Sequence, residues 1–381
     1  MRADRSIVIF SANYLPNIGG IERFTEGVSC ALAHMGVHVT IVTNNCFGLP
    51  SKEVLTEGVD IIRLPCYPLI GGRMPLPKPN REFRDLISSL SRASCDGVLI
   101  NARFYLHTII ALRFAKRRGL VPIVLDHGSA YLTFGNAALD VFVRAYEHCI
   151  TSFVKKYKPD FYGISQKSVE WLRTFGIDAK GVISNSINAS DYRLQASGRD
   201  FRSELGISKD SIVVSFSGRL IPEKGIDVLI RMMECLRNES IELIIAGDGP
   251  LRSYVQDSKL RKLHYVGRLS QPDIASLLLD SDLFCLPTRS EGFSTSLLEA
   301  AACGTPFLVT DVGGARELAP NRDYGIVFKG QPDSQSFADI VADFAAKRDE
   351  LVAMGELCRH RVEDRYSWSQ TAQSVLDALN L

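Results

Sequence analysis

The sequence lacks several features that would place it in a common functional class. Its nine cysteines form no CxxC pair and no cluster with histidine, so neither a disulfide framework nor a zinc site is expected. No GxGxxG motif is present, which argues against a nicotinamide-dependent dehydrogenase. We also find no Asp-x-Asp motif suited to hold a divalent metal on a diphosphate. The cysteines are therefore predicted to be reduced and mostly buried, and no metal or cofactor is predicted.

Long apolar runs and a strong net charge are missing as well. No window reaches the roughly 18 apolar residues that a membrane span needs, and the stretch MRADRSIVIF has too short an apolar run for a signal peptide. We therefore expect a cytoplasmic chain. The net charge of +1 gives no reason to expect a nucleic acid partner. The charge is uneven, however, because residues 1–190 hold 22 Lys+Arg against 15 Asp+Glu, and this predicts a basic surface on the first half.

The length of 381 residues predicts two domains, because one hydrophobic core seldom organises a chain of this size. Short β-branched runs alternate with amphipathic stretches in both halves, which is typical of parallel sheets wrapped by helices. The polar stretch 186–202 interrupts this pattern and is predicted to be a linker. We predict two doubly wound, Rossmann-like α/β domains facing a central cleft, at 1–190 and 191–366, followed by a C-terminal helix over 367–381. The expected strands lie at 6–10, 37–43, 59–64, 96–100, 122–126 and 162–165 in the first domain, and at 211–218, 241–247, 263–267, 282–287, 305–310 and 324–328 in the second.

The run EGFSTSLLEA is the most informative motif that is present. It places Glu291 in a loop and Glu299 on the second turn of a predicted helix, with Ser294 as the helix cap and Gly304 as its stop. The two carboxylates are spaced to grip different parts of one extended ligand. Backbone N–H groups at the start of the helix would favour an anion in the same space.

Cations precede a second predicted helix, which begins near Gly225. Arg219 and Lys224 follow a strand within SFSGRLIPEKG, and a guanidinium and an ammonium together suit a diphosphate. For an isolated pair, solvated surface charge is the more common explanation. Asp248 lies in AGDGPL, where an ordinary Asp-Gly turn is an equally good interpretation.

The first domain offers two further motifs at strand ends. Gly19 and Gly20 stand directly ahead of a predicted helix at 20–35, where backbone amides can approach a phosphate or a sugar hydroxyl; a tight turn is the plainer alternative. His127 lies just past a strand within LDHGSA, and a hydrogen-bonded structural histidine is the alternative there. The segment 68–79, rich in glycine and proline, is predicted to be an irregular loop.

Taken together, these motifs resemble the retaining glycosyltransferases of family 4, which have the two-domain GT-B fold. The resemblance covers nearly the whole chain. Its departures are NSIN at 185–188, where the family often has an Asn-Gly turn, and GFSTS in place of the commoner GFGLV. The motifs that carry it are the pair Glu291 and Glu299, SGRL with Arg219, PEKG with Lys224, AGDGP with Asp248, VGG with Glu317, GGIER with Gly20, and DHG with His127.

The resemblance implies transfer of a sugar from a nucleotide diphosphate sugar, UDP- or GDP-linked, with retention of the anomeric configuration and without a metal. It implies that Arg219 and Lys224 bind the diphosphate and that Glu299 binds the ribose. Glu291 and the amides of Gly292, Phe293 and Ser294 would hold the donor sugar. Gly19 and Gly20 would lie on the phosphate side, and His127 near the reacting carbon.

The acceptor is expected to be a glycan or a lipid-linked molecule, in the biosynthesis of cell-surface polysaccharide or lipopolysaccharide. The basic runs at 113–119 and 153–158 could touch anionic lipid at the inner face of the cell membrane, and a solvated helix face is the alternative. An epimerase or hydrolase of nucleotide sugars with the same fold is the competing enzyme class. A non-catalytic partner subunit is a third hypothesis. The sequence does not predict an oligomeric state.

Overall fold

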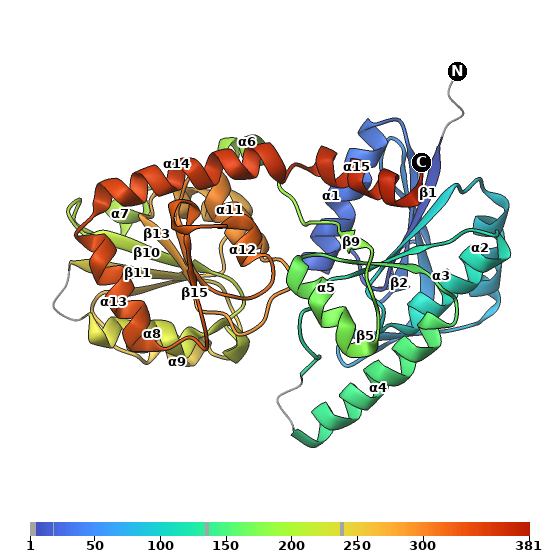
Figure 1. Ribbon diagram of the computed structural model, residues 1–381, viewed down its shortest axis with the longest axis horizontal. Helices are drawn as coiled ribbons and strands as arrows, with labels where there is room; N and C mark the ends of the chain where they lie inside the picture. The colour runs from blue at the N-terminus through green and yellow to red at the C-terminus, as the bar shows by residue number, and fades with distance from the viewer. Residues whose placement is uncertain (1–4, 18, 134–136, 237–239) are drawn as a thin grey trace. The chain divides into compact units, whose positions relative to one another are not determined.

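The computed structural model describes residues 5–17, 19–133, 137–236 and 240–381 (Figure 1). The chain divides into two compact units. The first comprises residues up to Ser186 together with Trp368–Leu381, and the second is Ile187–Ser367. The sequence had placed these boundaries at 190/191 and 366/367.

The first unit is built on a largely parallel sheet. Buried β-branched and aromatic runs form its central strands, and each of these pairs in parallel with its neighbours. Among the described strands of this unit, β3 and β5 run antiparallel, and both pair with β4. The strands in sheet order are β3 (Lys52–Thr56), β4 (Val59–Leu69), β2 (His38–Asn45), β1 (Ser6–Ser11), β6 (Gly97–Asn101), β7 (Ile123–Asp126), β8 (Asp160–Gly163) and β9 (Gly181–Val182), with β5 (Met74–Pro77) beside β4.

Helices cover both faces of this sheet (Figure 1). Both faces of the sheet are apolar, because side chains alternate along each strand. In β1, Val8 and Phe10 pack against helices on one face, while Ile7 and Ile9 are buried toward the other. The first face carries α2 and α3, and the second carries α1 and α15. The helices of this unit are α1 (Gly20–His34), α2 (Arg81–Arg92), α3 (Leu106–Arg117), α4 (Ala137–Lys155), α5 (Gln166–Leu172), the 3₁₀ turn η1 (Arg173–Phe175) and α15 (Trp368–Leu379).

The last helix, α15, belongs to the first unit although the second unit precedes it in the chain. It packs against α1, where Gly27 leaves room for Trp368: a Cβ at Gly27 would lie 2.3 Å from the indole. The chain thus passes between the units twice, after Ser186 and again before Trp368. Within the first unit, the hydroxyls of Ser186 and Thr371 are hydrogen-bonded at 2.6 Å. Within the second, the N–H of Ile187 donates to the carbonyl of Tyr366 at 2.9 Å.

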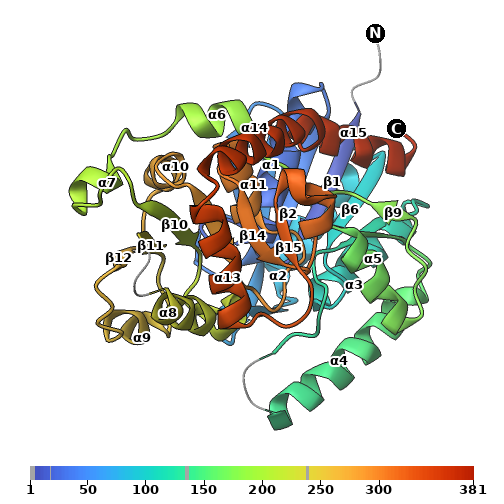
Figure 2. The ribbon, with the colours of Figure 1, turned by 60° about the vertical axis from the view of Figure 1, so that its left-hand side comes forward.

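The second unit is a doubly wound parallel sheet (Figure 2). Helix α8 packs with α13, while α11 packs with α6, α10 and α14. Its strands in sheet order are β12 (Leu263–Gly267), β11 (Ile241–Ala246), β10 (Ile212–Ser217), β13 (Leu283–Leu286), β14 (Phe307–Thr310) and β15 (Ile326–Phe328). Its helices are α6 (Ala189–Leu194), α7 (Phe201–Glu204), η2 (Pro222–Lys224), α8 (Ile226–Cys235), α9 (Arg252–Gln256), α10 (Gln271–Leu279), α11 (Thr295–Ala302), α12 (Ala315–Leu318), η3 (Arg322–Tyr324), α13 (Ser334–Ala345) and α14 (Arg348–Arg365).

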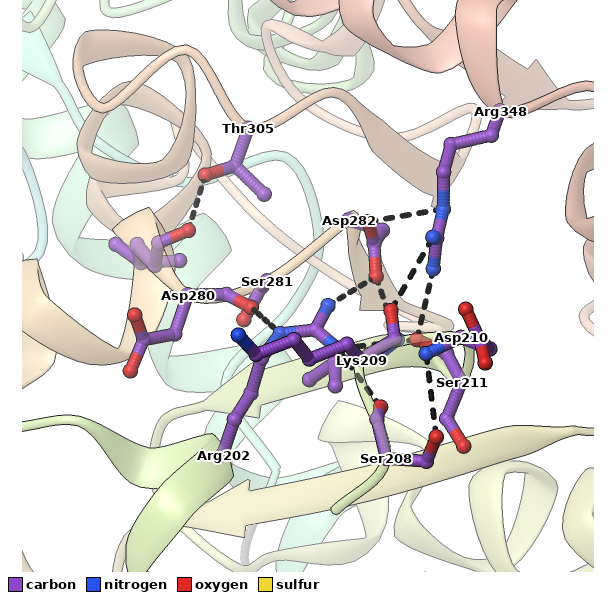
Figure 3. A network of polar contacts seen from close by, with 12 residues as sticks. Arg202, Ser208, Lys209, Asp210, Ser211, Asp280, Ser281, Asp282, Thr305 and Arg348 are labelled. Carbon is purple, nitrogen blue, oxygen red and sulfur yellow. Dashed lines mark hydrogen bonds and ion pairs between the residues drawn. The ribbon is translucent and has the colours of Figure 1, made fainter.

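A polar network closes the amino edge of this second sheet (Figure 3). Asp282, just before β13, pairs with Arg202 of α7 and accepts from the N–H of Val213 at 2.8 Å. Arg348 of α14 donates to the carbonyl of Ser211 at 2.8 Å. These charges fasten helices to the ends of strands. The network lies at the opposite end of the strands from the predicted site residues.

Three sequence predictions are wrong in detail. The segment 68–79 is not an irregular loop, because β4 continues to Leu69 and pairs with β5 as a hairpin. The segment 186–202 is not a linker throughout, since the second unit begins at Ile187 and the segment contains α6 and the start of α7, whose Phe201 is fully buried. The cysteines are free, as expected, but only Cys285, Cys303 and Cys358 are buried. None of the helices in the described ranges combines the length and apolar character needed to cross a bilayer.

Candidate functional site

The carboxyl ends of the strands of the second unit bring Lys224 and Glu291 into contact. Lys224 ends the turn η2 after β10, and Glu291 follows β13, which pairs with β10 in the sheet. Their side chains form an ion pair in which both groups are largely buried. The sequence assigns Lys224 to the diphosphate and Glu291 to the donor sugar, and the structure places the two side chains side by side.

Backbone contacts hold these two loops together. The hydroxyl of Thr288 donates to the carbonyl of Glu223 at 3.0 Å, and the N–H of Arg289 donates to the same carbonyl at 2.7 Å. Arg289 also forms a two-pronged ion pair with Asp227 on the first turn of α8. These contacts tie the turn that carries Lys224 to the loop that carries Glu291.

Helix α11 starts as the sequence predicts but is capped differently. Ser294 is the residue before its first turn, yet its hydroxyl meets that of Ser296 at 2.9 Å and makes no cap bond to the backbone. The side chain of Ser294 therefore does not cap the helix. Glu299 is buried on the second turn. Gly304 follows the helix in a left-handed conformation, which confirms the predicted stop.

The glycines of the VGG motif support the loop that carries Glu291. A Cβ at Gly313 would lie 2.5 Å from the carbonyl oxygen of Gly292, and one at Gly314 would lie 2.3 Å from the ring of Phe293. Phe293 itself is buried and packs near Tyr366. Close packing between the loops after β13 and β14 thus requires glycine at both positions.

Arg219 and Asp248 both lie at the carboxyl edge of the second sheet, on loops after neighbouring strands. Arg219 is exposed on the loop after β10. Asp248 is also exposed, and its carboxylate accepts from the N–H of Gly249 at 2.9 Å while its carbonyl accepts from Leu220 at 2.9 Å. The Asp-Gly turn is therefore accounted for by its own hydrogen bonds. Among the described residues no group of three or more His, Cys, Asp or Glu side chains is arranged to hold a metal ion.

In the first unit, Gly19 and Gly20 form the start of α1, which confirms the predicted helix start. Gly19 is the N-cap residue in an extended conformation and makes no side-chain cap bond. The carboxylate of Glu22, on the first turn, is buried and accepts from the amide of Asn17 at 2.6 Å. A negative charge therefore already lies at the helix start where the sequence suggested a phosphate.

His127 lies half-buried after β7 and is connected to α1 through two polar side chains. Its Nε2 is 2.9 Å from the amide oxygen of Asn101, and Asn101 donates to the hydroxyl of Thr25 at 2.9 Å. The ring meets the edge of Phe24 with centroids 5.0 Å apart. Burial lowers the pKa of His127 to about 3, so the imidazole is neutral at physiological pH.

A buried charge cluster lies next to His127 in the sequence. The guanidinium of Arg103 pairs with Asp126 at 2.6 Å and with Glu147 at 2.9 Å, and all three side chains are at most 1 % exposed. Burial raises the pKa of Glu147. Glu147 also accepts from the N–H of Leu132 at 2.9 Å. This cluster fixes the strand end from which His127 projects.

Sequence reasoning missed Thr25, Asn101, Arg103 and Glu147. Asn101 ends a buried strand and could have been found from that position. The other three lie on helices or beyond strand ends without a motif, and only the tertiary structure brings them together.

Two family models match the chain in succession. Glycosyltransferase family 4 matches residues 18–191, and glycosyl transferases group 1 matches residues 198–361. The chain belongs to this glycosyltransferase family. Its predicted enzyme class, a sugar transferase, follows from that membership.

Relatives of this glycosyltransferase include an uncharacterized glycosyltransferase of Methanocaldococcus jannaschii, 30% identical over 54% of each chain. The match thus spans about half the length of that relative. The GPI3 subunit of phosphatidylinositol N-acetylglucosaminyltransferase from Saccharomyces cerevisiae is 24% identical over 81% of this chain and 68% of its own.

Solved structures show the same fold at low identity. Sucrose-phosphate synthase of Thermosynechococcus elongatus superposes with a TM-score of 0.76 at 18% identity, covering 97% of both chains. HepE of Anabaena, in complex with UDP-glucose, superposes with a TM-score of 0.72 at 16% identity, covering 98% of this glycosyltransferase and 99% of its own chain. The predicted fold class, GT-B with two Rossmann-like α/β domains, is confirmed.

Proposed function

We propose that the chain is a retaining hexosyltransferase that uses a nucleotide diphosphate sugar, UDP- or GDP-linked, and takes part in cell-surface polysaccharide or lipopolysaccharide biosynthesis. The observation that carries this proposal is the contact between Lys224 and Glu291 beside the start of α11. A cation and a carboxylate beside a helix start at one strand edge suit a diphosphate joined to a sugar. HepE, which shares the fold, was solved with UDP-glucose.

Different residues bind different parts of the donor. Arg219, exposed after β10, and Lys224 bind the diphosphate. Glu299, buried on α11, accepts hydrogen bonds from the ribose hydroxyls. Glu291 and the backbone amides of the loop before α11 hold the sugar. Asp248 borders the same ligand.

In the transfer, the bond between the anomeric carbon and the diphosphate oxygen breaks and its electron pair leaves with the nucleotide. The acceptor oxygen bonds to the same face of that carbon, and its proton passes to a diphosphate oxygen. Negative charge thus grows on the diphosphate, where Arg219 and Lys224 stabilise it as fixed cations in place of a metal. His127, neutral after burial, contacts the sugar near the reacting carbon.

The acceptor is proposed to be a glycan or lipid-linked molecule, reached at an anionic membrane surface on its cytoplasmic side. Helix α4 supports this, because Val141 and Phe142 are 67% and 71% exposed on it and Lys156 follows it. Part of the basic runs is used inside the protein: Arg118 donates to the carbonyl of Ser91 at 2.8 Å, and Lys155 donates to that of Gly176 at 2.9 Å. The lipid contact therefore rests on the apolar face of α4 as well as on charge.

A screen of nucleotides tests the donor assignment. UDP or GDP, at 100 times its dissociation constant, should add about 2.7 kcal/mol to the free energy of unfolding, measured as a thermal shift. Glu299→Gln should weaken this shift, while Glu350→Gln, at an exposed position of α14, should not. No shift with any nucleoside diphosphate would contradict the proposal.

Retention is tested with Glu291→Gln. This variant should turn over more slowly, because the sugar is held less well, and should give a product of unchanged anomeric configuration by NMR. An inverted product, or a trapped covalent sugar on the wild-type protein, would show that the mechanism is different.

Membrane contact is tested by sedimentation with vesicles containing anionic lipid at low salt. The wild-type protein should sediment with them, and Val141→Ser with Phe142→Ser should not. Val352→Ser, which changes a 61% exposed valine on α14, is the matched control. If the wild-type protein stays in the supernatant, the membrane proposal is wrong.

A further inference from the structure

The shortest hydrogen bond that the Thr25 hydroxyl can donate goes to a backbone carbonyl. This hydroxyl lies 2.7 Å from the carbonyl oxygen of Ile21, one helical turn earlier in α1, and a carbonyl oxygen can only accept. The hydroxyl of Ser11 is farther away, at 3.4 Å, and gives its own proton to the carbonyl of Asn13 at 2.8 Å. The hydroxyl oxygen of Thr25 therefore presents a lone pair to the Asn101 side chain and accepts a hydrogen bond from it.

This fixes the orientation of the Asn101 side chain. Its amide must present the NH₂ group to Thr25, because two lone pairs would otherwise face each other at 2.9 Å. The amide oxygen then points to His127. Thr25 and Asn101 are 0% and 2% exposed, so water does not compete with these bonds.

The orientation of Asn101 in turn fixes the tautomer of His127. An amide oxygen at 2.9 Å from Nε2 requires that Nε2 carries the proton. In a neutral imidazole, Nδ1 is then the acceptor. Among the described residues, no hydrogen bond to Nδ1 occurs.

We propose that Asn101, held by Thr25, is a positioning residue that keeps His127 in the Nε2–H tautomer, so that Nδ1 accepts a hydrogen bond from a hydroxyl of the transferred sugar. This inference rests on the proposed function. The position of the proton on His127 then depends on α1, because the carbonyl of Ile21, within the GGIER motif, orients the hydroxyl of Thr25.

The groups packed against His127 do not supply a competing charge. Phe24 of α1 forms a T-shaped contact with the imidazole and carries no charge. Asp126, the preceding residue, is bound to Arg103 and accepts from the N–H of Gly128 at 2.9 Å. The neutral ring is therefore governed by its hydrogen bond to Asn101.

The tautomer is measured directly by the ¹⁵N NMR of labelled histidine in the free enzyme, with His127 assigned from the loss of its signals in His127→Gln. We expect a protonated Nε2 and an unprotonated Nδ1 in the wild-type protein. Asn101→Asp should raise the pKa of His127, because a carboxylate stabilises the imidazolium, and the pH profile of kcat/KM should shift accordingly. A protonated Nδ1 in the wild-type protein would overturn the inference.

Thr25→Val and Thr25→Ser form the matched pair for kinetics. Valine keeps the volume but removes the acceptor for Asn101, so a mixture of tautomers and a loss of about tenfold in kcat/KM are expected. Serine keeps the hydroxyl and should behave as the wild-type protein. Unchanged NMR signals and kcat/KM in Thr25→Val would also overturn the inference. The NMR result needs no substrate, so it remains readable if the nucleotide screen contradicts the proposed function.

Discussion

Arg219→Met and Lys224→Met should each lower kcat by about 10²- to 10³-fold, as expected when a preorganised hydrogen-bond donor to developing negative charge is lost. Methionine retains a long apolar side chain and removes only the charge. Lys224 should be the more sensitive position, because the same substitution leaves Glu291, its largely buried partner, without the ion pair. Initial rates of sugar transfer from the donor found by the nucleotide screen give the measurement.

The control is Lys209→Met, which removes an exposed cation of the same unit before β10. Its rate should stay within about twofold of the wild-type rate, since an isolated exposed charge contributes at most about 0.5 kcal/mol. If the Arg219 and Lys224 variants both keep more than a tenth of wild-type turnover, these residues do not stabilise the diphosphate.

Arg103→Met is expected to have the largest effect on stability. The substitution leaves the buried carboxylates of Asp126 and Glu147 without their shared cation, which costs about 3–5 kcal/mol. The unfolding temperature of the first unit should fall by about 10 °C, measured by scanning calorimetry. Activity should fall with it, because Asp126 immediately precedes His127.

Two comparisons separate the buried charge from the loss of one side chain. Arg113→Met, at an exposed position of α3, should change the free energy of unfolding by at most about 0.5 kcal/mol. Combining Arg103→Met with Asp126→Asn and Glu147→Gln should recover much of the loss, since no unpaired charge then remains buried. An unfolding temperature unchanged in Arg103→Met would show that the cluster contributes nothing to stability.

Local patterns were sufficient to predict most of the sheets. Buried β-branched runs such as SIVIF identify central strands because both of their faces must be apolar. Three strands of the first unit were missed: β3 is mostly exposed and antiparallel, β5 is antiparallel and contains two prolines, and β9 is only two residues long. The short helix α7 was missed because only one of its residues, Phe201, is fully buried, so no periodicity reveals it.

The candidate site was predictable as residues but not as contacts. The types and spacing of Glu291 and Lys224 pointed to a ligand, yet 67 positions separate them, and only the pairing of β10 with β13 brings them together. The chain from Thr25 through Asn101 to His127 joins three elements and has no local signature. Hydrogen-bond direction, and therefore a tautomer, is a property of the folded structure alone.

The passage of the chain between the units at Ser186 and again at Trp368 gives the two units different backbone connectivity. The second unit is one continuous segment, whereas the first is completed only when α15 has been synthesised. A single backbone cut at either crossing leaves both units covalently joined, and two cuts are needed to separate them. During synthesis, the space beside Gly27 stays without Trp368 until α15 has been made, so the first unit reaches its final packing after the second has been made.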